Sequence, residues 1–174
     1  MMKASPSNFG RPCPTRAFSW GIWGLLAVFG WVGCSGMSST WAEDTVVVGL
    51  RRTLCFGGCP DYEFTLHGNG EATLRVGPFS EEVFGRHLEQ GLHTASVDLK
   101  AWSDVLQLGE TLGFDTLQAR YDNPMVMDLP AAIITLEGQE VFNRYGGPNL
   151  NALYTTIERH IGATDWKADP KTAR

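Results

Sequence analysis

The stretch that decides the fold is Tyr62–Val76, YEFTLHGNGEATLRV. Its first part alternates apolar and polar residues, which is the period of a half-buried β-strand. The HGNG at 67–70 predicts a tight turn, because Asn and Gly accept the left-handed backbone that such turns require. The ATLRV at 72–76 then provides a returning strand. The stretch therefore predicts a β-hairpin, and with it an antiparallel sheet.

Further strands are expected on both sides of this hairpin. Apart from the edge strand near 85–88, they are rich in β-branched and aromatic residues and are bounded by turn residues. In chain order they are 45–50 (TVVVGL), a short edge strand near 85–88, 131–136 (AAIITL) and 140–145 (EVFNRY), the last two joined by the turn EGQ. We expect the rest of 77–96 and the long connection 114–130 to be irregular.

Two segments have the spacing of amphipathic helices. In the first, Leu99, Trp102, Leu106 and Leu112 recur on one face, after a capping Ser96 or Asp98 and before Gly113. In the second, Leu150, Leu153, Ile157 and Ile161 form the apolar face, between Pro148 in the first turn and Gly162 at the end. Trp166 is expected to pack back against the domain.

The order of these elements predicts the fold class. It is an α+β domain of two layers, with a mainly antiparallel sheet of about five strands and two amphipathic helices on one face. We place this single domain at 45–167. A small, polar tether is predicted at 34–44 and a frayed polar tail at 168–174.

The first 33 residues are typical of an export signal. Residues 1–16 are basic and contain no acid, and 17–33, AFSWGIWGLLAVFGWVG, carry no charge. A membrane-spanning helix needs about 20 predominantly apolar residues, and this run is shorter and rich in glycine. We therefore expect a signal peptide over 1–33 rather than a retained anchor.

The end of this segment, WVGCSG, resembles the lipobox of bacterial lipoproteins. The resemblance implies a lipid on Cys34 and a periplasmic or outer-membrane lipoprotein of the cell envelope. The alternative is ordinary cleavage after TWA, near Ala42, which would give a soluble secreted or periplasmic protein.

The charge of the exported part argues against one class of partner. Three of the 14 Lys and Arg residues and none of the 19 acidic residues precede Cys34. The remainder carries 11 basic and 19 acidic residues, a net charge of −8. Nucleic acid requires patches of Lys and Arg, so we expect no nucleic-acid partner.

Two cysteines remain in the domain, Cys55 and Cys59, within LCFGGCPDY. Gly57 and Gly58 let the chain reverse sharply enough for the short Cα separation of a disulfide, and an exported protein meets an oxidising compartment. A thioredoxin-type pair has two intervening residues rather than three, and a zinc site requires four ligands. The disulfide is favoured, and a thiol redox or metal-binding role of the pair remains the alternative.

Arg52, Asp61, Tyr62 and Asp128 are the candidates for a binding site. If Arg52, Asp61 and Asp128 met at a cleft, they would suit a small-ligand binder or a hydrolase. Each also has a structural explanation, such as turn chemistry for an Asp beside Pro. The chain contains no phosphate-binding glycine motif, no HExxH and no GxSxG. We assign no catalytic residue, metal or cofactor, and favour a protein that is not an enzyme.

The block RRTLCFGGCPDYEFTLHGNGEATLRVG is similar to the signature Cys-Phe-Gly-x-Cys-Pro-x-Tyr of an uncharacterised bacterial family, catalogued as a domain of unknown function. Downstream, MDLPAAIITLEGQEVFNRYGGP resembles the second block of that family, and the resemblance covers about 46–166. It implies an envelope lipoprotein and supplies no activity. We therefore expect a non-enzymatic module that binds an envelope protein or polymer and is held at the membrane by its N-terminal lipid.

Overall fold

Strand β1 (Val46–Arg52) lies at the centre of the sheet. It pairs antiparallel with β2 (Tyr62–His67) on one side and with β6 (Ala132–Leu136) on the other. The computed structural model describes residues 41–170, which all belong to one compact unit of the chain, 38–174. The run of β-branched residues in β1 suits this central position, because side chains there are buried by neighbours on both sides.

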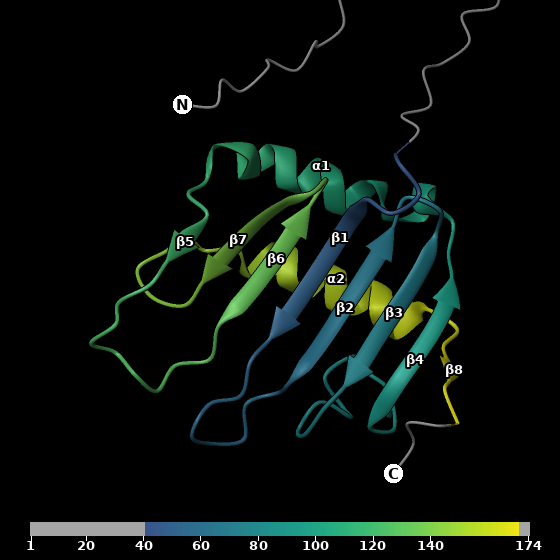
Figure 1. Ribbon diagram of the computed structural model, residues 1–174, viewed down its shortest axis with the longest axis horizontal. Coiled ribbons are helices and arrows are strands. Elements are labelled where there is room, and N and C mark those ends of the chain that lie inside the picture. The colour runs from purple at the N-terminus through teal and green to yellow at the C-terminus, as the bar shows by residue number, and fades with distance from the viewer. Residues whose placement is uncertain (1–40, 171–174) are drawn as a thin grey trace, which may run out of the picture. The chain divides into compact units, whose positions relative to one another are not determined.

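The other strands and helices complete a sheet that is covered on one face. They are β3 (Glu71–Val76), β4 (Gly91–Ser96), the 3₁₀ turn η1 (Leu99–Trp102), α1 (Ser103–Thr111), η2 (Phe114–Thr116), β5 (Arg120–Tyr121), β7 (Gln139–Asn143), α2 (Asn151–Ala163) and β8 (Lys167–Ala168). The strand order is β5-β7-β6-β1-β2-β3-β4-β8, and only the β5–β7 pair is parallel (Figure 1).

Both predicted hairpins are present. β2 pairs with β3 from Tyr62↔Val76 to Leu66↔Ala72. Gly70, in the turn between these strands, has φ +82°. β6 pairs with β7 across a turn in which Glu137 and Gly138 both have positive φ, as a tight hairpin turn requires.

The predicted number of strands was wrong, because the sheet has eight strands rather than about five. β4 lies in a segment expected to be irregular, and no strand forms at 85–88. The sequence of β4, GLHTAS, has few β-branched residues, so the strand structure of β4 depends on pairing with β3 along its full length. β5 and β8 contain two residues each, too few for any periodicity to appear.

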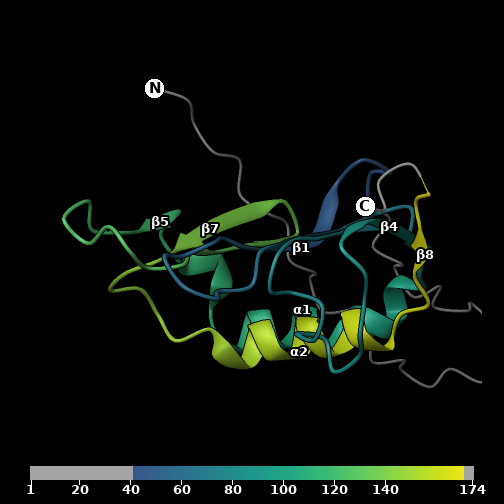
Figure 2. The ribbon, with the colours of Figure 1, turned by 90° about the horizontal axis from the view of Figure 1, so that it is seen from below.

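Figure 2 shows both helices on the same side of the sheet, as predicted. The predicted face of α2 is buried, and so are Trp102 and Val105 at the start of α1. Leu112 is an exception: it was expected on the buried face and is 36% exposed. Trp166 is buried against Phe64, also as predicted.

The ends of the helices differ in part from the expected ones. Asp98 caps the first helical segment through the amide of Lys100, and Gly113 follows α1 with φ +64°, both as predicted. α2 begins only at Asn151, so Pro148 precedes the helix instead of lying in its first turn as predicted. The Asn149 side chain accepts a hydrogen bond from the Asn151 amide.

Gly162 lies inside α2 rather than ending it. A Cβ at this position would collide with the backbone carbonyl oxygen of Phe84, which approaches the helix at this point. The glycine is therefore explained by close packing of the β3–β4 connection against α2, not by helix termination.

Three connections between strands emerge at the same end of the sheet: 53–61 between β1 and β2, 77–90 between β3 and β4, and 122–131 between β5 and β6 (Figure 1). We call this the loop end. The chain enters β1 at the opposite end. The expected signal peptide, Cys34 and most of the tether lie outside the described residues. Within residues 41–170, no helix has the length and apolar character needed to cross a membrane.

Candidate functional site

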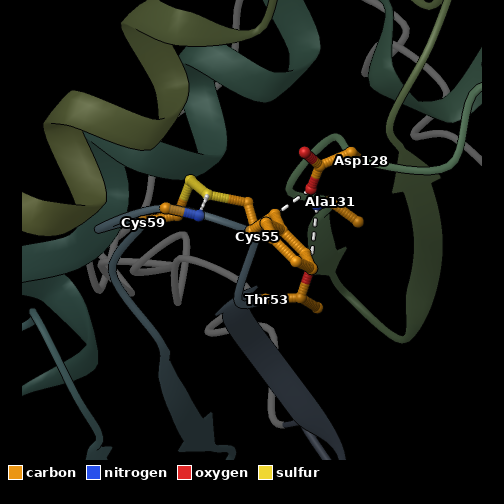
Figure 3. The surroundings of a disulfide bond; sticks show 7 residues. Thr53, Cys55, Cys59, Asp128 and Ala131 are labelled. Atoms are coloured by element: carbon orange, nitrogen blue, oxygen red, sulfur yellow. Dashed lines mark hydrogen bonds between the residues drawn. A yellow bond between two sulfur atoms is a disulfide. The ribbon is translucent and has the colours of Figure 1, made fainter.

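A disulfide joins Cys55 and Cys59 at the loop end, with their Cα atoms 5.5 Å apart (Figure 3). The loop that it closes is attached to the 122–131 connection. The amide of Phe56 donates a 2.8 Å hydrogen bond to Oδ1 of Asp128. Next to it, Thr53 exchanges two hydrogen bonds with Ala131, through the Thr53 amide and the Thr53 hydroxyl oxygen. Asp128 therefore holds two loops together, which is a structural use of its carboxylate.

Asp61 attaches the same loop to its other neighbour, the 77–90 connection. Its carboxylate binds Arg75 at two points, with N–O distances of 2.9 and 3.2 Å. Its carbonyl oxygen accepts hydrogen bonds from the Ser80 hydroxyl and the Gly77 amide, at 2.7 and 2.8 Å. Ser80 is fully buried, so this junction is well packed.

Arg52 and Tyr62 meet on the helix side of the sheet. They are register partners in β1 and β2, and both reach the same carboxylate oxygen of Glu158 on α2. The Tyr62 hydroxyl donates to Glu158 Oε1 at 2.5 Å, and Arg52 Nη2 lies 3.5 Å from that oxygen. The Arg52 guanidinium carbon also lies 4.5 Å from the centre of the Tyr154 ring. This cluster fastens α2 to the centre of the sheet.

The surroundings of Tyr62 keep its phenol protonated. Burial raises the pKa of Tyr62 far above its ordinary range, and the adjacent Glu158 carboxylate raises it further. Burial also raises the pKa of Tyr154, whose hydroxyl accepts a hydrogen bond from Asn143. Neither phenol is therefore suited to act as a base or nucleophile near neutral pH.

The four candidate residues thus come to one end of the sheet but do not form one cleft. Arg52 and Tyr62 share Glu158, Asp61 binds Arg75, and Asp128 binds the Phe56 amide. Among residues 41–170, no three His, Cys, Asp or Glu side chains lie close enough to hold a metal ion together. The polar groups of this arrangement fix the conformation of the loops.

A surface groove of about 510 Å³ lies at the opposite end, beside the turn between β2 and β3. It is lined by Trp41, Val97, Leu99, Leu106 and several polar residues. Its Asn69 and Asp98 side chains are already engaged, with Glu71 and with the Lys100 amide. None of the candidate residues predicted from the sequence lines this groove.

The feature that sequence reasoning missed is a set of exposed apolar side chains at the loop end. Phe56 is 95% exposed, and Met125 and Met127 are 87% and 86% exposed. We define the loop-end apolar patch as Leu54, Phe56, Phe79, Met125, Met127 and Leu129. The available signal was the composition of LCF and PMVMDLP, which carry large apolar residues in segments full of turn formers.

Phe79 has an unusual backbone as well as an exposed side chain. Its φ is +60°, a conformation that is costly for an aromatic residue, and its side chain is 60% exposed. Hydrogen bonds to the carbonyl of Pro78 from the Asp61 amide and the Ser80 hydroxyl hold the chain around it. A Cβ at Gly58 would lie 3.9 Å from the Phe79 ring, so Phe79 borders the cysteine loop. Such strain often occurs at functional sites.

The fold and the site together define a class: a two-layer α+β domain with a disulfide-closed loop and an apolar patch at one end of its sheet. The family model of DUF6438, a domain of unknown function, matches residues 46–161, from the first residue of β1 almost to the end of α2. The chain belongs to this family. No match to a curated protein, and none to a solved structure, reached significance.

The disulfide should stabilise the domain modestly. Closing so short a loop contributes about 2 kcal/mol in the chain-entropy description of disulfides. We expect the double variant Cys55→Ser, Cys59→Ser to lower the free energy of unfolding by about this amount. Denaturant titration monitored by Trp fluorescence measures it. The unmodified protein in reductant should have the same free energy of unfolding as the variant. Equal free energies for the variant, the reduced protein and the oxidised protein would contradict the prediction.

Tyr62 should make the protein sensitive to alkali. Because its pKa is raised on folding, its contribution is complete below the unfolded value of about 10 and is lost as the pH rises above it. We expect Tyr62→Phe to lower the free energy of unfolding at pH 7 by about 1.5–3 kcal/mol, since a hydrogen bond to a carboxylate is lost.

In the same variant, the decline of stability between pH 10 and 12 should be less steep than in the unmodified protein. Denaturant titrations at several pH values measure both effects. Tyr145→Phe serves as the control, because Tyr145 is 47% exposed. Identical slopes for Tyr62→Phe and the unmodified protein would contradict the assignment.

Proposed function

We propose that this chain is an exported, lipid-anchored protein of the cell envelope, and that its DUF6438 domain is a non-enzymatic binding module. The loop-end apolar patch is the binding surface. The observation that carries the proposal is the exposure of six large apolar side chains on three adjoining loops of one domain. Soluble monomers seldom expose large contiguous apolar patches unless these bind something.

The loops that carry the patch are fixed before any partner arrives. The disulfide, the Asp128–Phe56 hydrogen bond and the Asp61–Ser80 hydrogen bond each tie neighbouring parts of the loop end together. A surface ordered in advance loses less conformational entropy on binding, which favours affinity. The polar groups are used for this ordering, which leaves the apolar side chains to make contact.

Export is supported by the basic and then apolar N-terminal segment and by the lipobox-like sequence around Cys34. The disulfide fits the same location, because such bonds persist in oxidising compartments. The fixed partners of Arg52, Asp61 and Asp128 weigh against the alternative of a hydrolase or small-ligand cleft built from these three residues.

The intact mass of the mature protein from native membranes tests the anchoring. We expect a diacylglyceryl group, with or without a further acyl chain, on a chain that begins at Cys34. Alkylation should leave Cys55 and Cys59 unmodified until a reductant is added. A Cys34→Ser variant should lose the lipid mass. A soluble chain beginning near Glu43, with both thiols freely alkylated, would instead direct attention to thiol chemistry at CFGGC.

Site-specific photocrosslinking in cells tests the binding surface. A photoreactive phenylalanine analogue at position 56 should give a discrete crosslinked species, since this side chain is almost fully exposed. The same analogue at Leu112, which directly follows α1 and is 36% exposed, should give none. The absence of a crosslink from position 56, or equal crosslinks from both positions, would contradict the proposal.

A further inference from the structure

We infer that the loop-end apolar patch binds a protein segment whose apolar residues are flanked by Lys and Arg. The inference rests on the proposed function and adds the chemistry of the partner. It follows from the charges around the patch, from the nature of its side chains and from its place on the domain.

The loops of the loop end are acidic. Together, 53–61, 77–90 and 122–131 contain six acidic residues, one Arg and no Lys. Two of the acids are neutralised, Asp61 by Arg75 and Asp122 by Arg120 and Arg144. The Arg on these loops, Arg86, donates to the carbonyl of Thr164.

Four carboxylates remain that form no ion pair with Lys or Arg among the described residues: Glu81, Glu82, Glu89 and Asp128. Lys100 belongs to η1 and lines the groove at the opposite end, whereas Lys167 pairs with Thr94 of β4 and Arg51 lies two residues before the 53–61 loop. The four carboxylates outnumber these two nearby cations. The patch is therefore apolar with unneutralised negative charge beside it.

This charge separates the possible occupants. In a symmetric dimer built on the patch, the same carboxylates would face each other, and like charges in contact oppose association. An anionic bilayer attracts surfaces rich in Lys and Arg, and this surface has the opposite sign. A protein segment that places Lys and Arg beside apolar residues complements both features of the surface.

The side chains themselves suit a protein partner. Met125 and Met127 are flexible and polarisable, and such side chains adapt to apolar surfaces of irregular shape. Phe56 within the disulfide loop and Phe79 beside Gly58 of that loop provide larger and stiffer contacts. We take about 200 Å² of accessible surface for each fully exposed large side chain and scale it by the exposed fraction of each residue. The six residues then offer on the order of 800 Å² of accessible surface. A standard protein interface buries about this area on each partner.

The position of the patch agrees with this assignment. The chain enters β1 at the end of the sheet opposite the loop end (Figure 1). The seven residues of β1 separate the two ends by about 23 Å. A domain anchored through Cys34 would thus present the patch away from its own membrane, where another protein can reach it.

The test uses the mature protein, in nanodiscs of neutral lipid where it carries an anchor, and a fluorescent 14-residue peptide of Leu and Lys in an amphipathic helical pattern. The matched probe replaces every Lys by Glu. We expect the Leu/Lys peptide to bind and the Leu/Glu peptide not to bind, as measured by fluorescence anisotropy. Affinity should fall at least tenfold in the double variant Phe56→Ser, Met127→Ser. It should fall about fivefold in the double variant Glu82→Gln, Glu89→Gln.

Leu112→Ser is the control for the apolar variant and should leave the affinity unchanged. Failure of the Leu/Lys peptide to bind, or equal binding of the Leu/Glu peptide, would overturn the inference. So would patch-dependent binding to vesicles of phosphatidylglycerol, or a dimer that Phe56→Ser dissociates. If Phe56 nevertheless forms its crosslink in cells, the proposed function stands and only the partner class fails. If neither the peptide nor the crosslink appears, both fail.

Discussion

The pairing of Arg52 with Tyr62 across β1 and β2 is the constraint on which the rest of the structure depends. It places both side chains on the helix side of the sheet, where the Glu158 carboxylate receives both of them. One residue of α2 thereby fixes how the helix layer lies on the central strands. The same pairing forces the nine residues 53–61 to leave the sheet and return to it at neighbouring positions, so they must form a projecting loop.

The loop end inverts the usual distribution of side chains, and the inversion has a physical reason. Asp61 and Asp128 satisfy backbone and side-chain donors of adjoining loops, so their charge is used to hold the backbone in place. Phe84 and Leu88 of the 77–90 connection pack into the core, whereas the residues of the loop-end apolar patch lie outside it. Phe56 and Met125 therefore remain in water, where they add nothing to the stability of this chain. The proposed binding function accounts for their exposure.

The sequence predicted the parts of the fold that depend on local pattern. Both hairpins and the buried face of α2 follow from periods of 2 and 3.6 residues, and the Cys55–Cys59 disulfide from spacing and glycines. β4 was not predicted, because its strand structure depends on pairing with its neighbour β3. The role of Glu158 was not predicted, because it depends on two residues about 100 positions earlier in the chain. The apolar patch was not predicted, because loop residues follow no period that distinguishes exposed from buried side chains.

The disulfide of the cysteine loop matters more for the conformation of the loop than for the stability of the domain. A loop this short contributes only about 2 kcal/mol when it is closed, and the buried core lies elsewhere in the domain. Without the closure, Gly57 and Gly58 would leave the backbone free to take many conformations, and the Phe56 side chain would move with them. Closure of the loop and the hydrogen bond that the Phe56 amide donates to Asp128 restrict that freedom. The disulfide thus acts mainly on the one side chain of the loop that is almost entirely exposed, which is a side chain of the proposed binding surface.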